Sequence, residues 1–193
     1  MKRSTATLTV KALLAVFLVV VLAGCGSKLK EEVKGTWLLE NQVDDENLEV
    51  TYFDLLPDGK LDETTFFYED SEDDDGEVYT MTFKSVIKGT WKLVGRDLEM
   101  NYDLSTLQVE FKDVKYKSSS VEENDELNLS LTESYSEYIK DDEESYYKTL
   151  YDYYKEDSGK AYLDIKIEGT TMSGSSSEGP LSFTKVDASA VRE

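Results

Sequence analysis

The sequence predicts a mainly β domain: an antiparallel up-and-down meander of about 8–10 strands, closed as a barrel, with one amphipathic helix before the last strands. Apolar and polar residues alternate over many short runs, which is typical of strands with one buried face. Turn signals such as Pro57-Asp58-Gly59 and Gly95-Arg96-Asp97 separate these runs. One segment, residues 141–154, repeats its apolar side chains at helical spacing instead. A barrel is favoured over a sandwich because a closed sheet leaves no exposed edge strands.

The first 25 residues indicate a secretion signal that ends at a lipidation site. Basic residues up to Lys11 precede an apolar stretch, Ala12 to Ala23, that is short for a membrane span. The sequence Leu22-Ala23-Gly24-Cys25 resembles the lipobox of bacterial lipoproteins. This resemblance implies a signal peptide over residues 1–24, acyl chains on Cys25, and a domain held outside the cytoplasm on a membrane of the bacterial cell envelope. The alternative is an ordinary amino-terminal membrane anchor with an incidental cysteine.

The mature chain has the length of one domain with its own core. We expect the lipidated cysteine and a short tether over residues 25–32. The barrel domain is expected over residues 33–187, and a C-terminal tail over residues 188–193.

The individual strands follow the alternation. The clearest run is residues 98–104, which is apolar at every even position and polar at every odd one. The first strand is expected to begin at Gly35, and the segment from Gly174 onward is predicted as the turn before the last strand. The other apolar series are, in chain order, Leu48-Val50-Tyr52, Tyr79-Met81-Phe83, Leu127-Leu129-Leu131, Leu163-Ile165-Ile167 and Leu181-Phe183.

The predicted helix begins with the spacing of a capping box, Asp141 followed by Glu144. Gly159 stands where the helix should end, and a weaker helical turn is predicted over residues 134–140. Such a helix either packs on the barrel wall or closes one end, with its hydroxyls reaching water, or it forms a binding surface or lid. Its aromatic and apolar face comprises Tyr146, Tyr147, Leu150, Tyr151 and Tyr154.

A short repeat links two strands. Val33-Lys34-Gly35-Thr36-Trp37 returns as Ile87-Lys88-Gly89-Thr90-Trp91. In each copy the glycine allows a bulge or a close approach, and the tryptophan is placed on the inner face of a strand. A tryptophan pair inside a barrel would seal one of its ends.

These motifs resemble those of lipocalin-like bacterial lipoproteins, within the broad calycin group. Gly35-Thr36-Trp37 opens the first strand soon after the lipobox, and residues 56–61 resemble the first hairpin turn. Residues 89–98 resemble the hairpin in the middle of such domains, and residues 169–174 with 183–186 resemble the closing hairpin. The resemblance implies a lipocalin-like barrel over most of the mature chain, and it favours a small apolar ligand.

Composition excludes several kinds of chemistry. The chain has no histidine and one cysteine, so it offers no histidine-based catalysis, no disulfide within the chain and no thiolate zinc site. Its 41 acidic against 21 basic residues argue against nucleic acid. The acidic run of residues 69–77 does not match the EF-hand register, so it is read as a solvated loop rather than a metal site. We expect neither an enzyme nor a cofactor.

Two binding hypotheses remain, beside a third possibility, that the protein is a structural component of the cell envelope. In the first, the barrel holds a small lipophilic ligand, with Trp37, Trp91, Phe83 and Tyr102 lining a pocket or forming the barrel floor. In the second, the interior is filled by its own side chains, and the acidic surface with Tyr147, Tyr151 and Tyr154 binds a protein or glycan, directed at a basic partner. Alternation alone does not distinguish these, because packed and hollow barrels share it.

Overall fold

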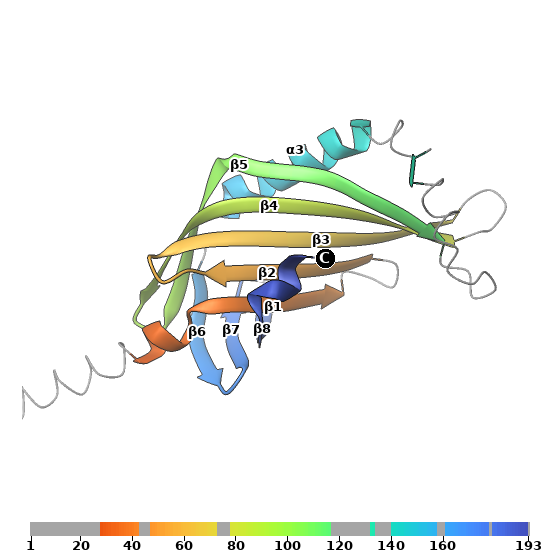
Figure 1. The fold of residues 1–193 in the computed structure, drawn as a ribbon. Helices are drawn as coiled ribbons and strands as arrows, with labels where there is room; N and C mark the ends of the chain where they lie inside the picture. Colours follow the sequence, from red (N-terminus) through yellow and green to blue (C-terminus); the bar gives the residue numbers. More distant parts are fainter. Residues whose placement is uncertain are drawn as a thin grey trace, which may run out of the picture.

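The computed structural model describes residues 28–42, 47–72, 78–116, 132–133, 140–157, 161–177 and 179–192. Eight strands pair in chain order, every pair is antiparallel, and β8 pairs with β1 to close the barrel (Figure 1). One long helix precedes the last three strands, so the predicted fold class is confirmed. The elements are β1 (Gly35–Gln42), β2 (Asn47–Leu55), β3 (Lys60–Glu72), β4 (Val78–Val94), β5 (Asp97–Tyr116), α3 (Lys140–Asp157), β6 (Ala161–Glu168), β7 (Thr171–Ser176), β8 (Gly179–Val186) and the 3-10 helix η1 (Ala188–Arg192).

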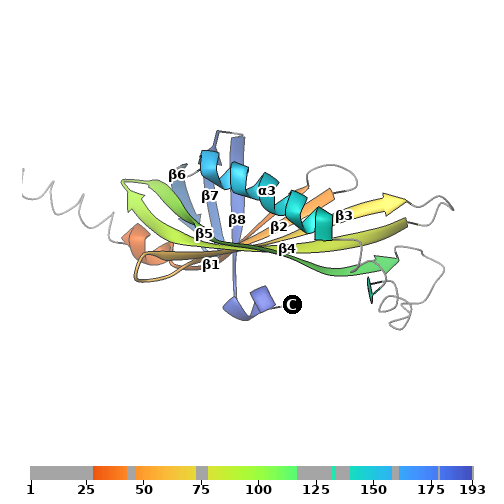
Figure 2. The same ribbon diagram turned by 90° about the horizontal axis from the view of Figure 1, so that it is seen from above.

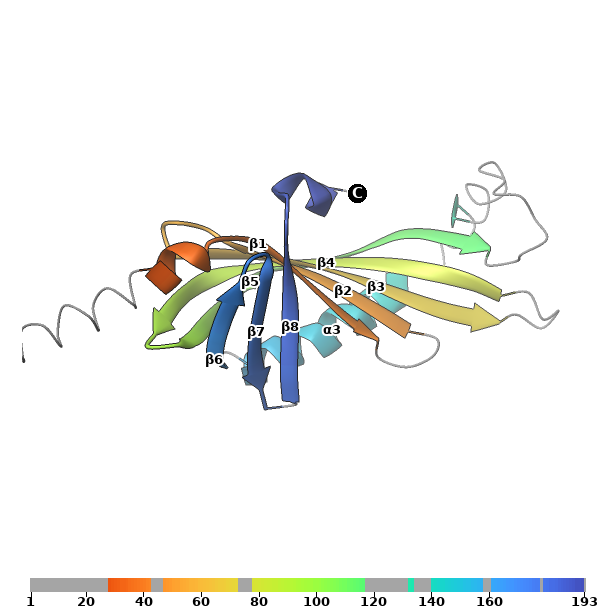
Figure 3. The same cartoon turned by 90° about the horizontal axis from the view of Figure 1, so that it is seen from below.

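Strands β3, β4 and β5 are much longer than the others and extend beyond the closed part of the barrel (Figures 1 and 3). β5 pairs with β6 only through Leu98 and Glu99, near its beginning. Beyond that point α3 packs on β5 and runs across the sheet (Figure 2). The helix therefore takes the place of strand pairing where β5 and β6 diverge.

The closed end of the barrel is filled by one apolar cluster that contains both tryptophans. Trp37 is completely buried, and its Nε1 donates a hydrogen bond to the carbonyl of Val33 at 2.7 Å. Trp91 Nε1 donates to the carbonyl of Leu56 at 3.0 Å. Each indole thus satisfies its polar group on a neighbouring backbone while its rings stay in the core. The cluster comprises Val33, Trp37, Phe53, Leu55, Leu61, Trp91, Leu98, Met100, Ile165, Met172 and Phe183.

Of the two glycines in the repeat, Gly89 allows the expected close approach, whereas Gly35 allows an unusual backbone conformation. Gly35 has a φ of 115°, a conformation that favours glycine. Gly89 lies directly against β5, where a methyl group would overlap the carbonyl oxygen of Asn101. Both tryptophans therefore follow a position where the backbone requires glycine.

Lys185 joins the closing strand β8 to the segment that precedes β1. Its Nζ lies 5.0 Å from the centroid of the Trp37 ring and donates a hydrogen bond to the carbonyl of Glu32 at 3.2 Å. Residues 28–32 form a short helix immediately before β1. The ammonium therefore lies over the ring of the buried tryptophan and holds this helix against β8.

Some local predictions differ from the structure, and others lie outside the described residues. Gly174 lies inside β7, paired with Leu181, so its predicted role as a turn residue is wrong. A methyl group at Gly174 would overlap the side chain of Ile165, so this glycine serves close packing instead.

The helix α3 begins at Lys140, which places the predicted cap Asp141 inside it. The predicted strand around Leu127, the helical turn over 134–139 and Gly159 lie outside the described residues.

No helix in the described part of the chain is both long and apolar enough to cross a membrane.

Candidate functional site

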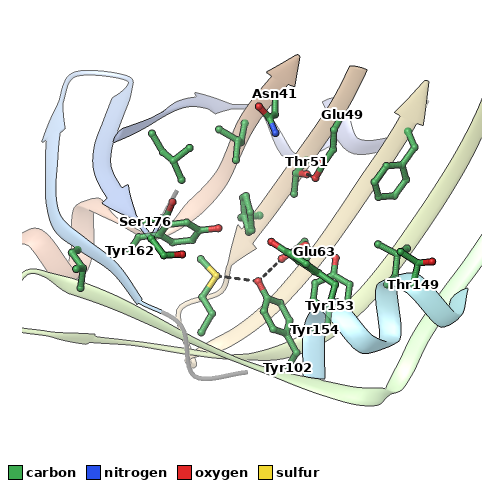
Figure 4. Close-up of a pocket in the computed structure, with 18 residues that line it drawn as sticks. Asn41, Glu49, Thr51, Glu63, Tyr102, Thr149, Tyr153, Tyr154, Tyr162 and Ser176 are labelled. Atoms are coloured by element: carbon green, nitrogen blue, oxygen red, sulfur yellow. Dashed lines mark hydrogen bonds between the residues drawn. The ribbon is translucent and has the colours of Figure 1, made fainter. Parts of the chain in front are cut away.

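A cavity of about 610 Å³ lies between the sheet and α3, beyond the filled end of the barrel (Figure 4). Strands β1, β2 and β3 form one wall, and α3 forms the opposite part of the lining. Its apolar lining residues are Leu39, Phe53, Phe67, Met100, Leu150, Leu163 and Leu181. Its other lining residues are Asn41, Glu49, Thr51, Glu63, Tyr102, Thr149, Tyr153, Tyr154, Tyr162, Ser176 and Ser177. The barrel is thus packed at one end and hollow at the other.

The central polar group of the cavity is the carboxylate of Glu63 on β3, which is only 5% exposed. The hydroxyl of Tyr102 on β5 donates a hydrogen bond to Oε2 of Glu63 at 2.6 Å, and the hydroxyl of Tyr154 on α3 donates one to Oε1 at 2.6 Å. Figure 4 shows the two rings meeting at this carboxylate from different elements. Two short bonds from hydroxyls are the kind of solvation that a buried carboxylate requires.

The same arrangement changes the acidity of both tyrosines. Burial raises the pKa of Tyr102 and of Tyr154 well above the ordinary value of 10.0, and the negative charge of Glu63 raises both further. Both phenols therefore remain donors at neutral pH.

A row of smaller polar side chains continues from this point across the sheet. Thr51 and Thr65 are direct neighbours on β2 and β3, and their hydroxyls lie 3.1 Å apart. Thr51 also donates to Oε1 of Glu49 at 3.2 Å. On β4, Ser85 pairs with Thr65, and its buried Oγ has no hydrogen-bond partner among the described residues. The inner wall is therefore polar along one line and apolar on either side.

Helix α3 is fastened to the inside of the sheet by its inward face. Tyr146 stacks on Phe83 with ring centroids 4.3 Å apart and donates to Oε2 of Glu69 at 2.6 Å. Oε1 of Glu143 accepts a hydrogen bond from the backbone N–H of Phe111 at 2.8 Å, on β5. Together with the bond from Tyr154 to Glu63, these contacts place the helix across the cavity as its cover.

The expected ligand-site residues fall into different places. Tyr102 lines the cavity. Trp37 and Trp91 lie in the packed apolar cluster and are not among the lining residues of the cavity. Phe83 is buried against Tyr146 and Phe111, outside the cavity. The structure therefore brings one of the four residues to the cavity lining and two to the packed apolar cluster.

The expected surface residues of the helix also separate. Tyr147 is 38% exposed and stacks with Tyr151 at 6.1 Å between ring centroids, so this pair faces outward in part. Tyr154 is only 3% exposed, so its predicted place on the exposed surface is wrong. Tyr154 lies four residues after the buried Leu150, on the same inward face of the helix, and its hydroxyl donates a hydrogen bond to Glu63.

Sequence reasoning missed Glu63. The residue occupies an inward position of β3, between Leu61 and Thr65, both buried. The available signal was its place in the alternation: Leu61, Thr65 and Phe67 share one face of the strand, and a glutamate on that face points inward.

Within the described ranges, no group of three or more acidic or cysteine side chains could hold a metal ion. Residues 73–77 of the acidic run, and Cys25, lie outside those ranges.

The fold and the cavity define a closed eight-stranded antiparallel barrel whose hollow end is covered by a helix. No protein-family model matches the chain, and none of the curated proteins matches it.

Proposed function

We propose that this chain is a membrane-anchored bacterial lipoprotein with a lipocalin-like barrel that binds a small apolar ligand, without catalysis. The observation that carries the proposal is the cavity between the sheet and α3. Its volume of about 610 Å³ falls in the range of small-molecule sites. Aromatic and aliphatic side chains line much of it, and polar groups such as Thr51 and Glu63 lie among them, where they could orient a ligand.

The proposed cellular location rests on the sequence. The lipobox-like segment ends at Cys25, and the first described residues follow it closely as a short helix that leads into β1. Lipidation of Cys25 would hold the barrel close to its membrane, where lipophilic molecules are concentrated. The acyl chains would serve as the anchor, and the cavity would remain available for a separate ligand.

Native mass spectrometry of residues 26–193, purified from bacterial cells without the lipid anchor, tests the proposal. All described elements lie within this chain. We expect a reproducible extra mass of a few hundred daltons that is lost on denaturation. Protein that stays bare after incubation with a lipid extract of the producing cells would contradict ligand binding.

A matched pair of substitutions on β1 locates the ligand. Leu39 lines the cavity, whereas the neighbouring Leu38 has its side chain on the other face of the strand. Leu39→Trp should reduce the bound fraction by filling the cavity, and Leu38→Trp should leave it unchanged. Equal binding by both variants would place the ligand elsewhere.

The second function is a surface that binds a protein or glycan partner. The outward part of α3 favours it, because Tyr147 is 38% exposed there on an acidic protein. A bare barrel that is captured by a basic partner, with capture lost in Tyr147→Ala, would support this alternative.

A further inference from the structure

The charge of the cavity lining indicates the chemistry of the ligand. Two glutamates, Glu49 on β2 and Glu63 on β3, line the cavity, and no lysine or arginine is among its described lining residues. Figure 4 shows both carboxylates on the sheet wall, on either side of Thr51. A ligand that enters this space therefore meets negative charge along one wall.

The hydrogen bonds at Glu63 are those that a carboxylate group accepts. Both of its oxygens accept a hydrogen bond from a tyrosine hydroxyl at 2.6 Å, and such bonds are strongest to a charged acceptor. Because the carboxylate is buried, its field inside the cavity is screened less than that of a surface glutamate.

The aromatic rings beside the carboxylates also suit a cation. Tyr102 and Tyr154 meet at Glu63 with ring centroids 4.8 Å apart, and Tyr153 packs edge-on against Tyr154 at 5.4 Å. The faces of such rings attract an ammonium group, most strongly where water is excluded. The remaining lining is suited to an apolar chain or ring system, through Phe53, Phe67 and other side chains.

We infer that the ligand is a cationic amphiphile: an apolar body that fills the cavity and a protonated amine that binds at Glu63 and Glu49. The inference rests on the proposed function and adds the class of ligand to it. A fatty acid is disfavoured, because its carboxylate would lie beside like charges in a poorly solvated site.

The test compares three probes with the same decyl chain: decylamine, decanol and decanoate. Each competes with the neutral fluorophore N-phenylnaphthylamine for residues 26–193 at neutral pH, where an alkylamine is protonated because its pKa resembles the lysine value of about 10.4. We expect decylamine to bind at least about tenfold more tightly than decanoate, because one charge-assisted hydrogen bond contributes a difference of this size. Decanol should bind with an affinity between the two.

Three variants assign the preference to the cavity. Glu63→Gln and Glu49→Gln keep the side-chain shape and should each reduce the preference for decylamine by about tenfold. Glu40→Gln is the matched control, because Glu40 lies on β1 beside Leu39 but is exposed. The Glu40→Gln substitution removes the same charge outside the cavity and should leave the preference for decylamine unchanged. Glu49→Gln carries the test alone if Glu63→Gln fails to fold, which thermal unfolding would reveal.

The outcomes separate the two proposals. If the fluorophore and decanol bind but decylamine has no advantage over decanoate, the cationic ligand is excluded and the apolar ligand site stands. The same conclusion follows if Glu40→Gln weakens decylamine as much as the cavity variants do. If neither the fluorophore nor any decyl probe binds, the proposed function fails as well.

Discussion

The hydroxyl of Tyr154 lies 2.6 Å from Oε1 of Glu63, and this hydrogen bond joins α3 to β3 through the interior of the barrel. The two residues are 91 positions apart in the chain. Tyr102 completes the group from β5, so one carboxylate connects three elements. The same contact therefore orders the polar wall of the cavity and holds the helix that covers it.

Removal of the Tyr154 hydroxyl should destabilise the protein. In Tyr154→Phe the ring remains, but Oε1 of Glu63 loses this donor in a buried position. We expect the free energy of unfolding to fall by about 1–3 kcal/mol, measured by denaturant titration at neutral pH. Tyr147→Phe removes a hydroxyl from the outer side of the same helix and should change it by less than about 0.5 kcal/mol. Equal effects would show that Glu63 does not hold the helix.

The two tyrosines should also make the fold sensitive to alkaline pH. Their pKa values are raised in the folded protein, so the unfolded chain loses these protons first, near the ordinary value of 10.0. The stabilisation is complete below that pH and decreases above it, by about 1.4 kcal/mol per pH unit for each tyrosine until the folded pKa is reached.

Denaturant titrations from about pH 9 to about pH 11 would measure this slope, and ultraviolet absorbance would follow the tyrosinate. The double variant Tyr102→Phe and Tyr154→Phe should begin less stable but show a clearly shallower slope. An unchanged slope would mean that other groups cause the alkaline loss.

The ammonium of Lys185 should stabilise the pairing of β8 with β1, which closes the barrel, in addition to the apolar contacts of its side chain. Lys185→Met keeps much of the stem but removes the ammonium that lies over Trp37 and binds the carbonyl of Glu32. We expect a loss of about 1–2 kcal/mol in thermal or denaturant unfolding. Lys166→Met, at an exposed position of β6, should have little effect. A loss of similar size in both variants would contradict the role of the ring contact.

Much of the fold could be predicted because its signals are local. The alternation around Leu98 identified β5, and the spacing of Tyr146 and Leu150 identified α3. The repeat correctly placed a tryptophan after each constrained glycine, with both indoles inside. Gly174 was misread, since a glycine that permits a turn and one that permits close packing look the same in sequence.

The candidate site was harder to predict. Only Tyr102 among the expected ligand residues reaches the cavity, and Tyr154 faces inward rather than outward. Periodicity shows that a helix has an aromatic face, but it does not show which tyrosine lies against the sheet. That choice depends on how α3 is rotated against β5, which the contacts of Tyr146 and Glu143 determine.

The sequence by itself determined that this chain forms an antiparallel sheet with one helix, because strand and helix periods are properties of neighbouring residues. Only the tertiary structure decided that Glu63, one of 41 acidic residues, becomes the buried polar centre of a cavity. Its burial depends on Tyr102 and Tyr154, which are 39 and 91 positions away and supply the hydrogen bonds that replace water. Such a site exists only when distant segments meet, since the desolvation of a carboxylate must be offset by donors that its neighbours in the chain do not provide.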